Sequence, residues 1–181
     1  MRVISGTARG RRLKDLPGMD TRPTTDKVKE SMFNIIQFDI PGRKVLDLYG
    51  GSGQLTVEAL SRGAASAVIL DRNPAAVKII RENVQACGFG EQTKILSMDA
   101  QAFLVGCREK FDVIFLDPPY AGPLLEESLK TITAIDIVSE HGIIVCESAL
   151  EKELPELPEP YEKGREYRYG KIKVTLYHRK A

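Results

Sequence analysis

Two short stretches of this sequence combine an apolar run with residues that can bind or react. Residues 45–53 (VLDLYGGSG) end in a glycine-rich turn, and residues 115–120 (FLDPPY) end in a carboxylate, two prolines and an aromatic ring. Each apolar run is typical of a buried strand. In an open α/β sheet, ligands bind beyond the carboxyl ends of the strands, where the winding direction reverses. We therefore expect the two stretches to be neighbours there, the first beneath a cofactor and the second beside the reacting group.

The first stretch predicts a loop that approaches a ligand closely. The pattern Asp47-x-x-x-Gly51-x-Gly53 places glycines between a strand and a helix, where the backbone itself can contact a ligand. It departs from the dinucleotide fingerprint Gly-x-Gly-x-x-Gly, because Thr56 stands where the third glycine would fall. A carboxylate at Asp47 would repel a pyrophosphate, but it suits a cationic or amine-bearing ligand.

Two further aspartates follow the next two predicted strands. Asp71 ends a strand over residues 67–70, where a carboxylate can accept hydrogen bonds from both hydroxyls of a ribose. Asp99 follows a strand over residues 93–96 and could accept a hydrogen bond from an adenine amino group. A single aspartate at such a position is often only a helix cap. Three of them in register with a glycine loop instead fit S-adenosylmethionine, which carries an ammonium, a sulfonium, a ribose diol and an adenine.

Asp117-Pro118-Pro119-Tyr120 is the more specific signal. Two prolines fix the backbone and remove two N–H donors, so nearby carbonyls face outward as acceptors. The carboxylate and these carbonyls match an exocyclic amino group on a planar base, and the Tyr120 ring can stack on that base. The nitrogen of such a base is a weak nucleophile. Orienting it and stabilising positive charge in the transition state is what this site can contribute, without a metal ion.

From residue 44 onward, strand patterns alternate with helix patterns, which predicts a parallel sheet with helices on both faces. The expected strands cover residues 45–48, 67–70, 93–96, 113–116 and 143–146, and the expected helices cover residues 55–60, 74–88, 102–105 and 124–132. Residues 161–169 and 172–177 alternate around Gly170-Lys171 and predict an antiparallel hairpin. Before the first strand, a helix capped by Thr24 or Thr25 is expected to end at Pro41-Gly42.

Composition narrows the class of protein. A chain of 181 residues, 43% hydrophobic and 28% charged, has the size of one globular domain, and we expect residues 1–181 to form it. No apolar run approaches the roughly 18–20 residues of a membrane span, and the N-terminal arginines lack the apolar stretch of a secretory signal. Cys87, Cys107 and Cys146 are widely spaced without histidines nearby. We therefore expect reduced thiols in a cytoplasmic protein, with neither a metal site nor a disulfide framework.

The net charge of +1 conceals basic ends around an acidic middle. Residues 1–14 contain no acid, and a hairpin or arm there would bury little by itself, which leaves its arginine side chains available to phosphates. The stretch from Tyr161 onward carries seven basic residues against only Glu162 and Glu166. This pattern suits a polyanion bound over the edges of the domain, and it is equally typical of a plain solvated surface.

The two motifs together resemble the amino-methyltransferases that depend on S-adenosylmethionine. The N-terminal residues narrow this resemblance, because residues 1–6 (MRVISG), 9–11 (RGR) and 21–28 (TRPTTDKV) are similar to the RsmD family. The resemblance covers nearly the whole chain, and the Thr-Arg-Pro-Thr block is its most specific part. The glycine loop reads DLYGGSG where the family pattern is DLFAGTG, and these exchanges are conservative.

This resemblance implies an α/β, Rossmann-like class I methyltransferase fold. Its sheet would be mostly parallel and seven-stranded, with helices on both faces and an antiparallel C-terminal hairpin. A basic N-terminal β-hairpin or arm (1–20) would precede the catalytic core (21–181). The implied reaction is transfer of a methyl group from S-adenosylmethionine to the N2 amino group of a specific guanine in bacterial small-subunit (16S) ribosomal RNA. The enzyme would act as a monomer on an assembled or assembling 30S particle.

The resemblance and the motifs also assign roles to residues. The expected catalytic residues are Asp117, Pro118, Pro119 and Tyr120. The expected cofactor-binding residues are Thr24, Asp47, Tyr49, Gly51, Gly53, Asp71, Arg72, Asp99 and Ala100, with Thr24 closing over the methionine end. The expected RNA-binding residues are Arg2, Arg9, Arg11, Arg12 and Arg22. Arg22 could either bind a phosphate or pin its own loop to the domain.

Three other interpretations stay open on the sequence alone. An adenine-N6 methyltransferase acting on DNA or RNA can share the Asp-Pro-Pro-Tyr loop, but such DNA enzymes usually need an inserted recognition domain, for which no segment here is long enough. A glutamine-N5 protein methyltransferase would more typically carry asparagine in place of Asp117. A nucleic-acid-binding module with a degenerate cofactor site conflicts with the intact aspartates and the intact Asp-Pro-Pro-Tyr loop.

Overall fold

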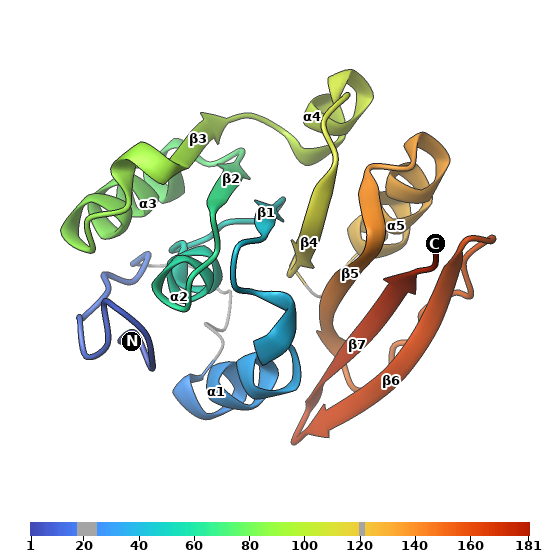
Figure 1. The fold of residues 1–181 in the computed structure, drawn as a ribbon, viewed down its shortest axis with the longest axis horizontal. Helices are drawn as coiled ribbons and strands as arrows, with labels where there is room; N and C mark the ends of the chain where they lie inside the picture. Colours follow the sequence, from blue (N-terminus) through green and yellow to red (C-terminus); the bar gives the residue numbers. More distant parts are fainter. Residues whose placement is uncertain (18–24, 120–121) are drawn as a thin grey trace.

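The computed structural model describes residues 1–17, 25–119 and 122–181. Within these ranges the chain forms seven strands, five α-helices and two short 3-10 helices (Figure 1). The α-helices are α1 (Asp26–Ile35), α2 (Gln54–Ser61), α3 (Pro74–Ala86), α4 (Ala100–Gly106) and α5 (Leu124–Ile135), and the 3-10 helices are η1 (Gln37–Asp39) and η2 (Gly90–Gln92). The strands are β1 (Lys44–Asp47), β2 (Ser66–Asp71), β3 (Thr93–Ser97), β4 (Phe111–Leu116), β5 (Val138–Ala149), β6 (Tyr161–Tyr169) and β7 (Ile172–Arg179).

All seven strands belong to one sheet with the order β3-β2-β1-β4-β5-β7-β6. The strands β1 to β5 pair in parallel, and β7 pairs antiparallel with both β5 and β6. The winding direction of the parallel strands reverses between β1 and β4, which are direct neighbours. The predicted sheet, mostly parallel with an antiparallel C-terminal hairpin, is confirmed.

Helices cover both faces of the sheet (Figure 1). One core packs α1, α2 and α3 against the sheet and includes Phe33, Leu60 and Ile80. The other packs α4 and α5 against the opposite face and includes Leu104 and Leu129. Strands covered on both faces carry continuous apolar runs, which is why β1 and β4 stand out in the sequence. Across the described ranges, every helix is too short or too polar to span a lipid bilayer.

Side-chain caps set where three of the helices begin. Thr25, Asn73 and Asp99 accept hydrogen bonds from backbone N–H groups in the first turns of α1, α3 and α4. The predicted cap at Thr25 and the predicted helix start at Pro74 are confirmed. The predicted end of the first helix at Pro41 is wrong. The chain leaves the α-helix earlier because its backbone tightens into the 3-10 turn of η1.

The arm, residues 1–14, is part of the folded domain. It forms a hairpin-like loop with an isolated antiparallel bridge between Arg2 and Arg12. The expectation that it buries little is wrong, because Val3, Ala8 and Leu13 are at most 6% exposed and lie in the core beside α1, α2 and α3. The arginine side chains of the arm are exposed, as predicted. The alternation of small apolar and basic residues therefore anchors one side of the arm and presents the other to solvent.

A buried ionic cluster fastens the arm to the helices. Glu58 on α2 is fully buried, and its carboxylate accepts hydrogen bonds from Ile4 N (2.8 Å), Ser5 N (3.0 Å) and Arg62 Nε (2.8 Å). The ammonium of Lys29, on α1, lies 3.7 Å from this carboxylate and donates to a backbone carbonyl of the arm (2.7 Å). Burial lowers the pKa of Lys29, and the nearby carboxylates act in the opposite direction.

Replacing Glu58 should therefore loosen the arm and destabilise the fold. Glu58→Ala removes the carboxylate nearest to the buried ammonium of Lys29 and leaves the N–H groups of Ile4 and Ser5 without their acceptor, so we expect a loss of about 3–5 kcal/mol in the free energy of unfolding. Hydrogen exchange at the amides of Ile4 and Ser5 should accelerate together with this loss. Glu91→Ala, at an exposed carboxylate on η2, is the control and should change neither quantity. Unchanged protection of Ile4 and Ser5 in Glu58→Ala would contradict this role.

Candidate active site

The glycine loop and the Asp-Pro-Pro stretch emerge side by side from the sheet. β1 and β4 pair in parallel with Asp47 opposite Phe115, so both strands end at the same edge. Leu48 N also donates to Phe115 O (3.4 Å), just beyond the end of β1. The expectation that these two stretches are neighbours at the reversal of winding is confirmed.

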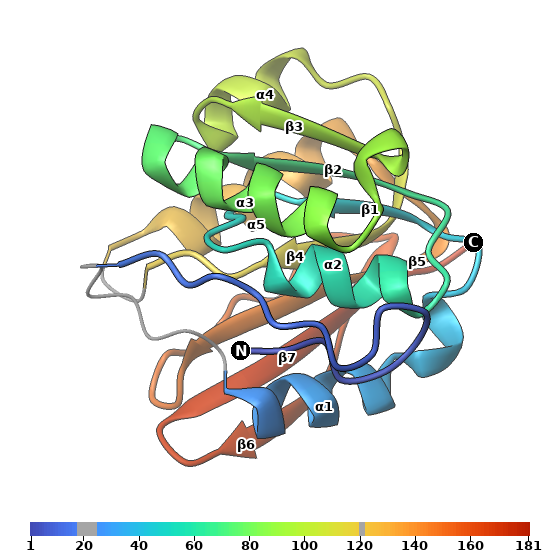
Figure 2. The ribbon, with the colours of Figure 1, turned by 90° about the vertical axis from the view of Figure 1, so that its left-hand side faces the viewer.

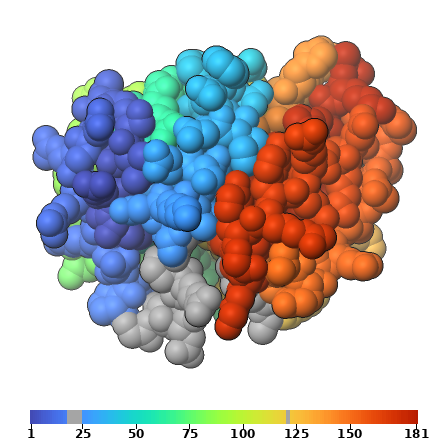
Figure 3. Space-filling view, turned by 90° about the horizontal axis from the view of Figure 1, so that it is seen from below, coloured from blue at the N-terminus to red at the C-terminus, as the bar shows by residue number. Residues whose placement is uncertain are grey.

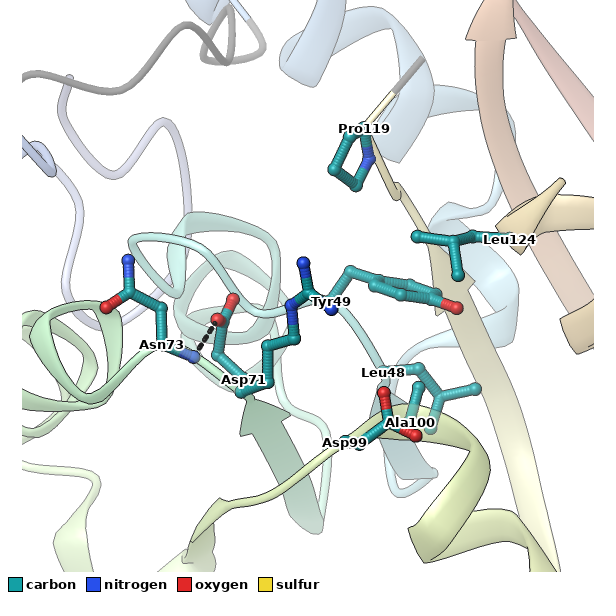
Figure 4. A pocket seen from close by; sticks show the side chains of 9 residues that line it. Leu48, Tyr49, Asp71, Asn73, Asp99, Ala100, Pro119 and Leu124 are labelled. Atoms are coloured by element: carbon teal, nitrogen blue, oxygen red, sulfur yellow. Dashed lines mark hydrogen bonds between the residues drawn. The ribbon is translucent and has the colours of Figure 1, made fainter. Parts of the chain in front are cut away.

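A cavity of about 430 Å³ opens at this edge. It is lined by Leu48, Tyr49, Asp71, Arg72, Asn73, Asp99, Ala100, Pro119 and Leu124. Figure 4 shows Asp71 and Asn73 on one side of it, and Pro119, Leu124 and the Tyr49 ring on the other. Residues from the ends of β1, β2 and β4 and from the starts of α4 and α5 thus surround one space. Its volume is in the range of small-molecule and cofactor sites.

Asp71 joins the cavity to the glycine loop. Its carboxylate accepts hydrogen bonds from Gly51 N (3.0 Å) and Asn73 N (2.9 Å). Gly51 and Gly53 have φ angles of +60° and +84°, a backbone conformation that residues with a side chain rarely adopt. These glycines therefore let the chain turn from β1 into α2 and aim an N–H group at Asp71. Neither glycine is among the residues that line the cavity.

Asp47 lies beneath the loop, away from the lining of the cavity. It is 2% exposed, and Thr56 Oγ1 donates a hydrogen bond to its carboxylate (2.9 Å). Burial raises the pKa of Asp47 to about 7, and the hydrogen bond from Thr56 opposes this shift. Thr56, which replaces the third glycine of the dinucleotide fingerprint, is thus the partner of the strand-end carboxylate.

Tyr49 links the end of β1 to α5. Its hydroxyl forms a hydrogen bond with Ser128 Oγ (2.7 Å), and Ser128 is fully buried on the first turns of α5. The pKa of the Tyr49 hydroxyl is raised because the side chain is buried, and the hydrogen bond with Ser128 only partly offsets this shift. Because α5 follows the Asp-Pro-Pro loop in the chain, this bond ties the wall of the cavity to the helix behind that loop.

Asp99 and its neighbours form the floor of the cavity. Asp99 caps α4 by accepting a hydrogen bond from Ala102 N (3.2 Å), so it is both a helix cap and a lining residue. Arg72 and Ala100 also line the cavity. Sequence reasoning missed three lining residues, Leu48, Asn73 and Leu124. Asn73 was detectable as a cap before Pro74, whereas the two leucines carry no signal beyond apolarity.

The predicted catalytic stretch reaches the cavity through its second proline. Pro119 is exposed and lines the cavity, whereas Pro118 is buried and Asp117 is half-buried. Beyond the loop, Lys152 Nζ donates to Gly122 O (3.1 Å) and holds the chain before α5. Tyr120 lies outside the described residues, as do Thr24 and Arg22.

The structure keeps the predicted RNA-binding arginines of the arm exposed on one side of α1. Arg2 and Arg9 line a second hollow of about 360 Å³ between the arm and the first turn of α1, together with Asp26, Lys27 and Glu30. Arg2 Nε lies 3.9 Å from Asp26 Oδ2. Arg11 and Arg12 are exposed beside them. No group of three or more His, Cys, Asp or Glu side chains within residues 1–17, 25–119 and 122–181 is arranged to hold a metal ion.

Comparison with known proteins finds a matching family model and similar proteins that cover nearly the whole chain. The family model described as "Conserved hypothetical protein 95" matches residues 1–178. "Putative rRNA methyltransferase YlbH" of Bacillus subtilis (strain 168) is 39% identical over 184 residues, which cover all of both chains. "Ribosomal RNA small subunit methyltransferase D" of Escherichia coli (strain K12) is 34% identical over 183 residues, covering 100% of this chain and 91% of that protein.

A solved structure agrees over the same length. The structure titled "Putative methyltransferase yhhF from Escherichia coli" superimposes with a TM-score of 0.90 at 33% identity. The match covers 100% of this chain and 98% of that one. The similarity therefore extends over the arm, the sheet and the C-terminal hairpin alike.

The burial of Asp47 predicts a distinct dependence of stability on pH. Because its pKa is raised from 3.8 to about 7 in the folded state, the folded chain holds a proton that the unfolded chain releases at lower pH. The free energy of unfolding should therefore fall as pH rises between these values, by up to about 1.4 kcal/mol per pH unit, and this contribution should level off about one pH unit above the folded-state pKa, near pH 8. Asp47→Asn removes it.

Denaturant unfolding of both proteins at several pH values checks this. The stability of Asp47→Asn minus that of the unsubstituted protein should grow from about pH 5 to about pH 8 and stay constant above. A difference that does not change with pH across this window would show that the buried carboxylate is ionised throughout.

Proposed function

Since the chain belongs to the family described as conserved hypothetical protein 95, the RsmD family, we propose that it methylates 16S ribosomal RNA of the bacterial small subunit. The methyl donor is S-adenosylmethionine, and the acceptor is the exocyclic N2 amino group of one guanine. The observation that carries this proposal is the shared cavity. Pro119 of the Asp-Pro-Pro stretch lines the same space as Asp71 and Asp99.

The residues around the cavity fit S-adenosylmethionine. When bound, this cofactor supplies an electrophilic methyl group on a sulfonium. Asp71 stands at the end of β2 with a carboxylate that can accept from the two ribose hydroxyls, and Asp99 stands at the start of α4 as an acceptor for the adenine amino group. Leu48 and Ala100 contribute apolar surface to the lining of the same cavity. Gly51 and Gly53 shape the glycine loop through their positive φ angles, and Asp47 supports this loop from beneath through its hydrogen bond with Thr56.

Asp117 and the prolines act on the acceptor base. The lone pair of the guanine N2 nitrogen is delocalised into the ring, so the site must orient this nitrogen and stabilise the positive charge that develops on it. Asp117 accepts a hydrogen bond from the amino group, and the carbonyls beside the prolines accept a second one. Tyr120 and Thr24 lie outside the described residues; Tyr120 would stack on the base, and Thr24 would close over the methionine end of the cofactor. The reaction needs no metal ion.

The exposed arginines of the arm, Arg2, Arg9, Arg11 and Arg12, bind RNA phosphates. Arg22, which lies outside the described residues, would either bind a phosphate as well or pin its own loop to the domain. The substrate is an assembled or assembling 30S particle. The arm and the site are both held rigidly in the domain, so they select a guanine whose surrounding RNA already has the matching shape. The chain works as a single catalytic domain and as a monomer in the cytoplasm.

Methyl transfer to defined substrates tests the proposal. Labelled S-adenosylmethionine is supplied with naked small-subunit RNA, or with small subunits that lack their native methylation, and the modified nucleoside is identified. N2-methylguanine at one position of the small subunits supports both the proposed reaction and the proposed 30S substrate. The same product on naked RNA alone would support the reaction and overturn the 30S substrate. N6-methyladenine would instead assign the enzyme to the adenine-N6 class. No transfer to either substrate, with cofactor binding intact, would move the search to DNA or protein amines.

Asp117→Ala should separate chemistry from cofactor binding. The substitution removes an acceptor that faces the base, so we expect methyl transfer to fall at least about 100-fold while the dissociation constant for S-adenosylmethionine stays within about twofold. Single-turnover transfer and calorimetric titration measure the two quantities. Asp39→Ala, on η1, is the matched control and should leave both unchanged. An equal loss of transfer and of cofactor affinity would overturn the division of roles.

A further inference from the structure

The turn between β6 and β7 lies at the same edge of the sheet as the candidate active site. β7 runs antiparallel to β5, so its first residue, Ile172, pairs with Ala149 at the end of β5. β5 in turn pairs in parallel with β4, with Cys146 opposite Leu116. Figure 2 shows the β6–β7 turn at the end of the molecule where β4 finishes. The antiparallel order of the hairpin thus places its tip, residues 168–171, at the same edge of the sheet as the Asp-Pro-Pro loop, with β5 between β4 and β7.

Register gives the approximate separation. Thr175 of β7 lies level with Leu116, two strands away, which is about 10 Å across the sheet. Lys171 is four residues beyond Thr175 toward the active edge, or about 13 Å along the strand direction. The tip therefore lies roughly 16 Å from the start of the Asp-Pro-Pro loop. A strand of RNA that enters the site would pass this tip within a few nucleotides of the target.

The basic residues at this tip have no acidic partner among the described residues. Both acids of β6 are already neutralised: Glu166 lies 2.9 Å from the ammonium of Lys173, and Glu162 lies 3.2 Å from that of Lys180. Arg165, Arg168 and Lys171 are exposed and form no ion pair within the described chain. The hairpin therefore presents three uncompensated positive charges, two of them at the tip.

The tip is held in place by the rest of the domain. Leu150 N, just past β5, donates to Lys171 O (2.9 Å). Tyr167 and Tyr169 are half-buried and pack against the core that also contains residues of α1. Binding at such a fixed surface costs little ordering entropy.

The arm, α1 and the hairpin form adjacent bands across one face of the molecule, as Figure 3 shows. Within the arm, however, the turn is bound to the far end of α2, because Thr7 N donates to Ser61 O (2.8 Å) and Ala8 N to Ser61 Oγ (2.9 Å). This part of the arm lies one helix length from the glycine loop. The hairpin tip supplies positive charge at the active edge itself.

We infer that the β6–β7 tip, through Arg168 and Lys171, is a second RNA-contact surface that binds phosphates flanking the target nucleotide across the site from the arm. This inference rests on the proposed ribosomal RNA substrate. Phosphate contacts of this kind position the RNA and carry no sequence information. The tip and the arm together would hold the RNA on both sides of the cavity and fix the acceptor base over it.

The salt dependence of RNA binding tests the inference. The full-length protein and the double variant Arg168→Ala/Lys171→Ala are titrated with unmethylated small-subunit RNA, or subunits if the transfer assay selects those, over a range of KCl concentrations. Each lost phosphate contact should reduce the slope of log Kobs against log[salt] by about 0.7–0.9, so the double variant should lose about 1.4–1.8. Affinity for S-adenosylhomocysteine, measured separately, should not change.

A charge-matched control separates this effect from a change in net charge. Lys94→Ala/Arg108→Ala removes one lysine and one arginine that are exposed at the opposite edge of the sheet, near the starts of β3 and β4. Its salt slope should equal that of the unsubstituted protein. The same slope for all three proteins, or an equal loss in both double variants, would overturn the inference.

The two proposals fail in different ways. If the unsubstituted protein methylates ribosomal RNA but the tip variant keeps its slope and its kcat/KM, the hairpin inference fails and the proposed function stands. If the unsubstituted protein neither methylates nor binds ribosomal RNA, the proposed function fails, and the inference falls with it. A tip variant with a raised KM, an unchanged kcat and the reduced slope supports both.

Discussion

The parallel pairing of β1 with β4 is the contact on which the site depends. It sets Asp47 opposite Phe115, and so it brings the glycine loop and the Asp-Pro-Pro loop, more than sixty residues apart in the chain, to one edge. Because winding reverses at this pair, the helices that follow the two strands lie on opposite faces and leave a space between the loops. The cavity lined by Asp71, Asp99 and Pro119 occupies that space.

Buried polar side chains support this arrangement from behind. Asn83 is an example: it accepts a hydrogen bond from Lys14 N (2.8 Å) and donates to the carbonyls of Lys14 (3.0 Å) and Ser52 (2.7 Å), which joins the arm to the glycine loop. Glu58 secures the other part of the arm, and Thr56 holds Asp47. Each such group is costly to bury unpaired, so each fixes its partners firmly. The binding elements are thereby built into the core.

The structure also gives the basic ends of the chain different roles. The arm is anchored by Val3, Ala8 and Leu13 along α1 and α2, with its arginines directed outward. The C-terminal hairpin extends the sheet by two strands and returns its turn to the active edge. A polyanion that touched both would lie across α1.

The sequence by itself determined which stretches form strands and helices, the carboxylates at the ends of β1 and β2 and the cap at Asp99, because burial on both faces, caps and turns are local and leave direct marks in residue order. Most ends of these elements were placed only to within three residues, and β5 begins at Val138, five residues before the predicted start. Only the tertiary structure decided that Asp47 faces Thr56 beneath the loop, that Leu48, Asn73 and Leu124 line the cavity, and that the arm belongs to the core. It alone also placed the hairpin tip at the active edge. These facts depend on which distant segments share a face or an edge of the sheet. The order of the strands in the sheet determines this, and no single stretch of sequence specifies that order.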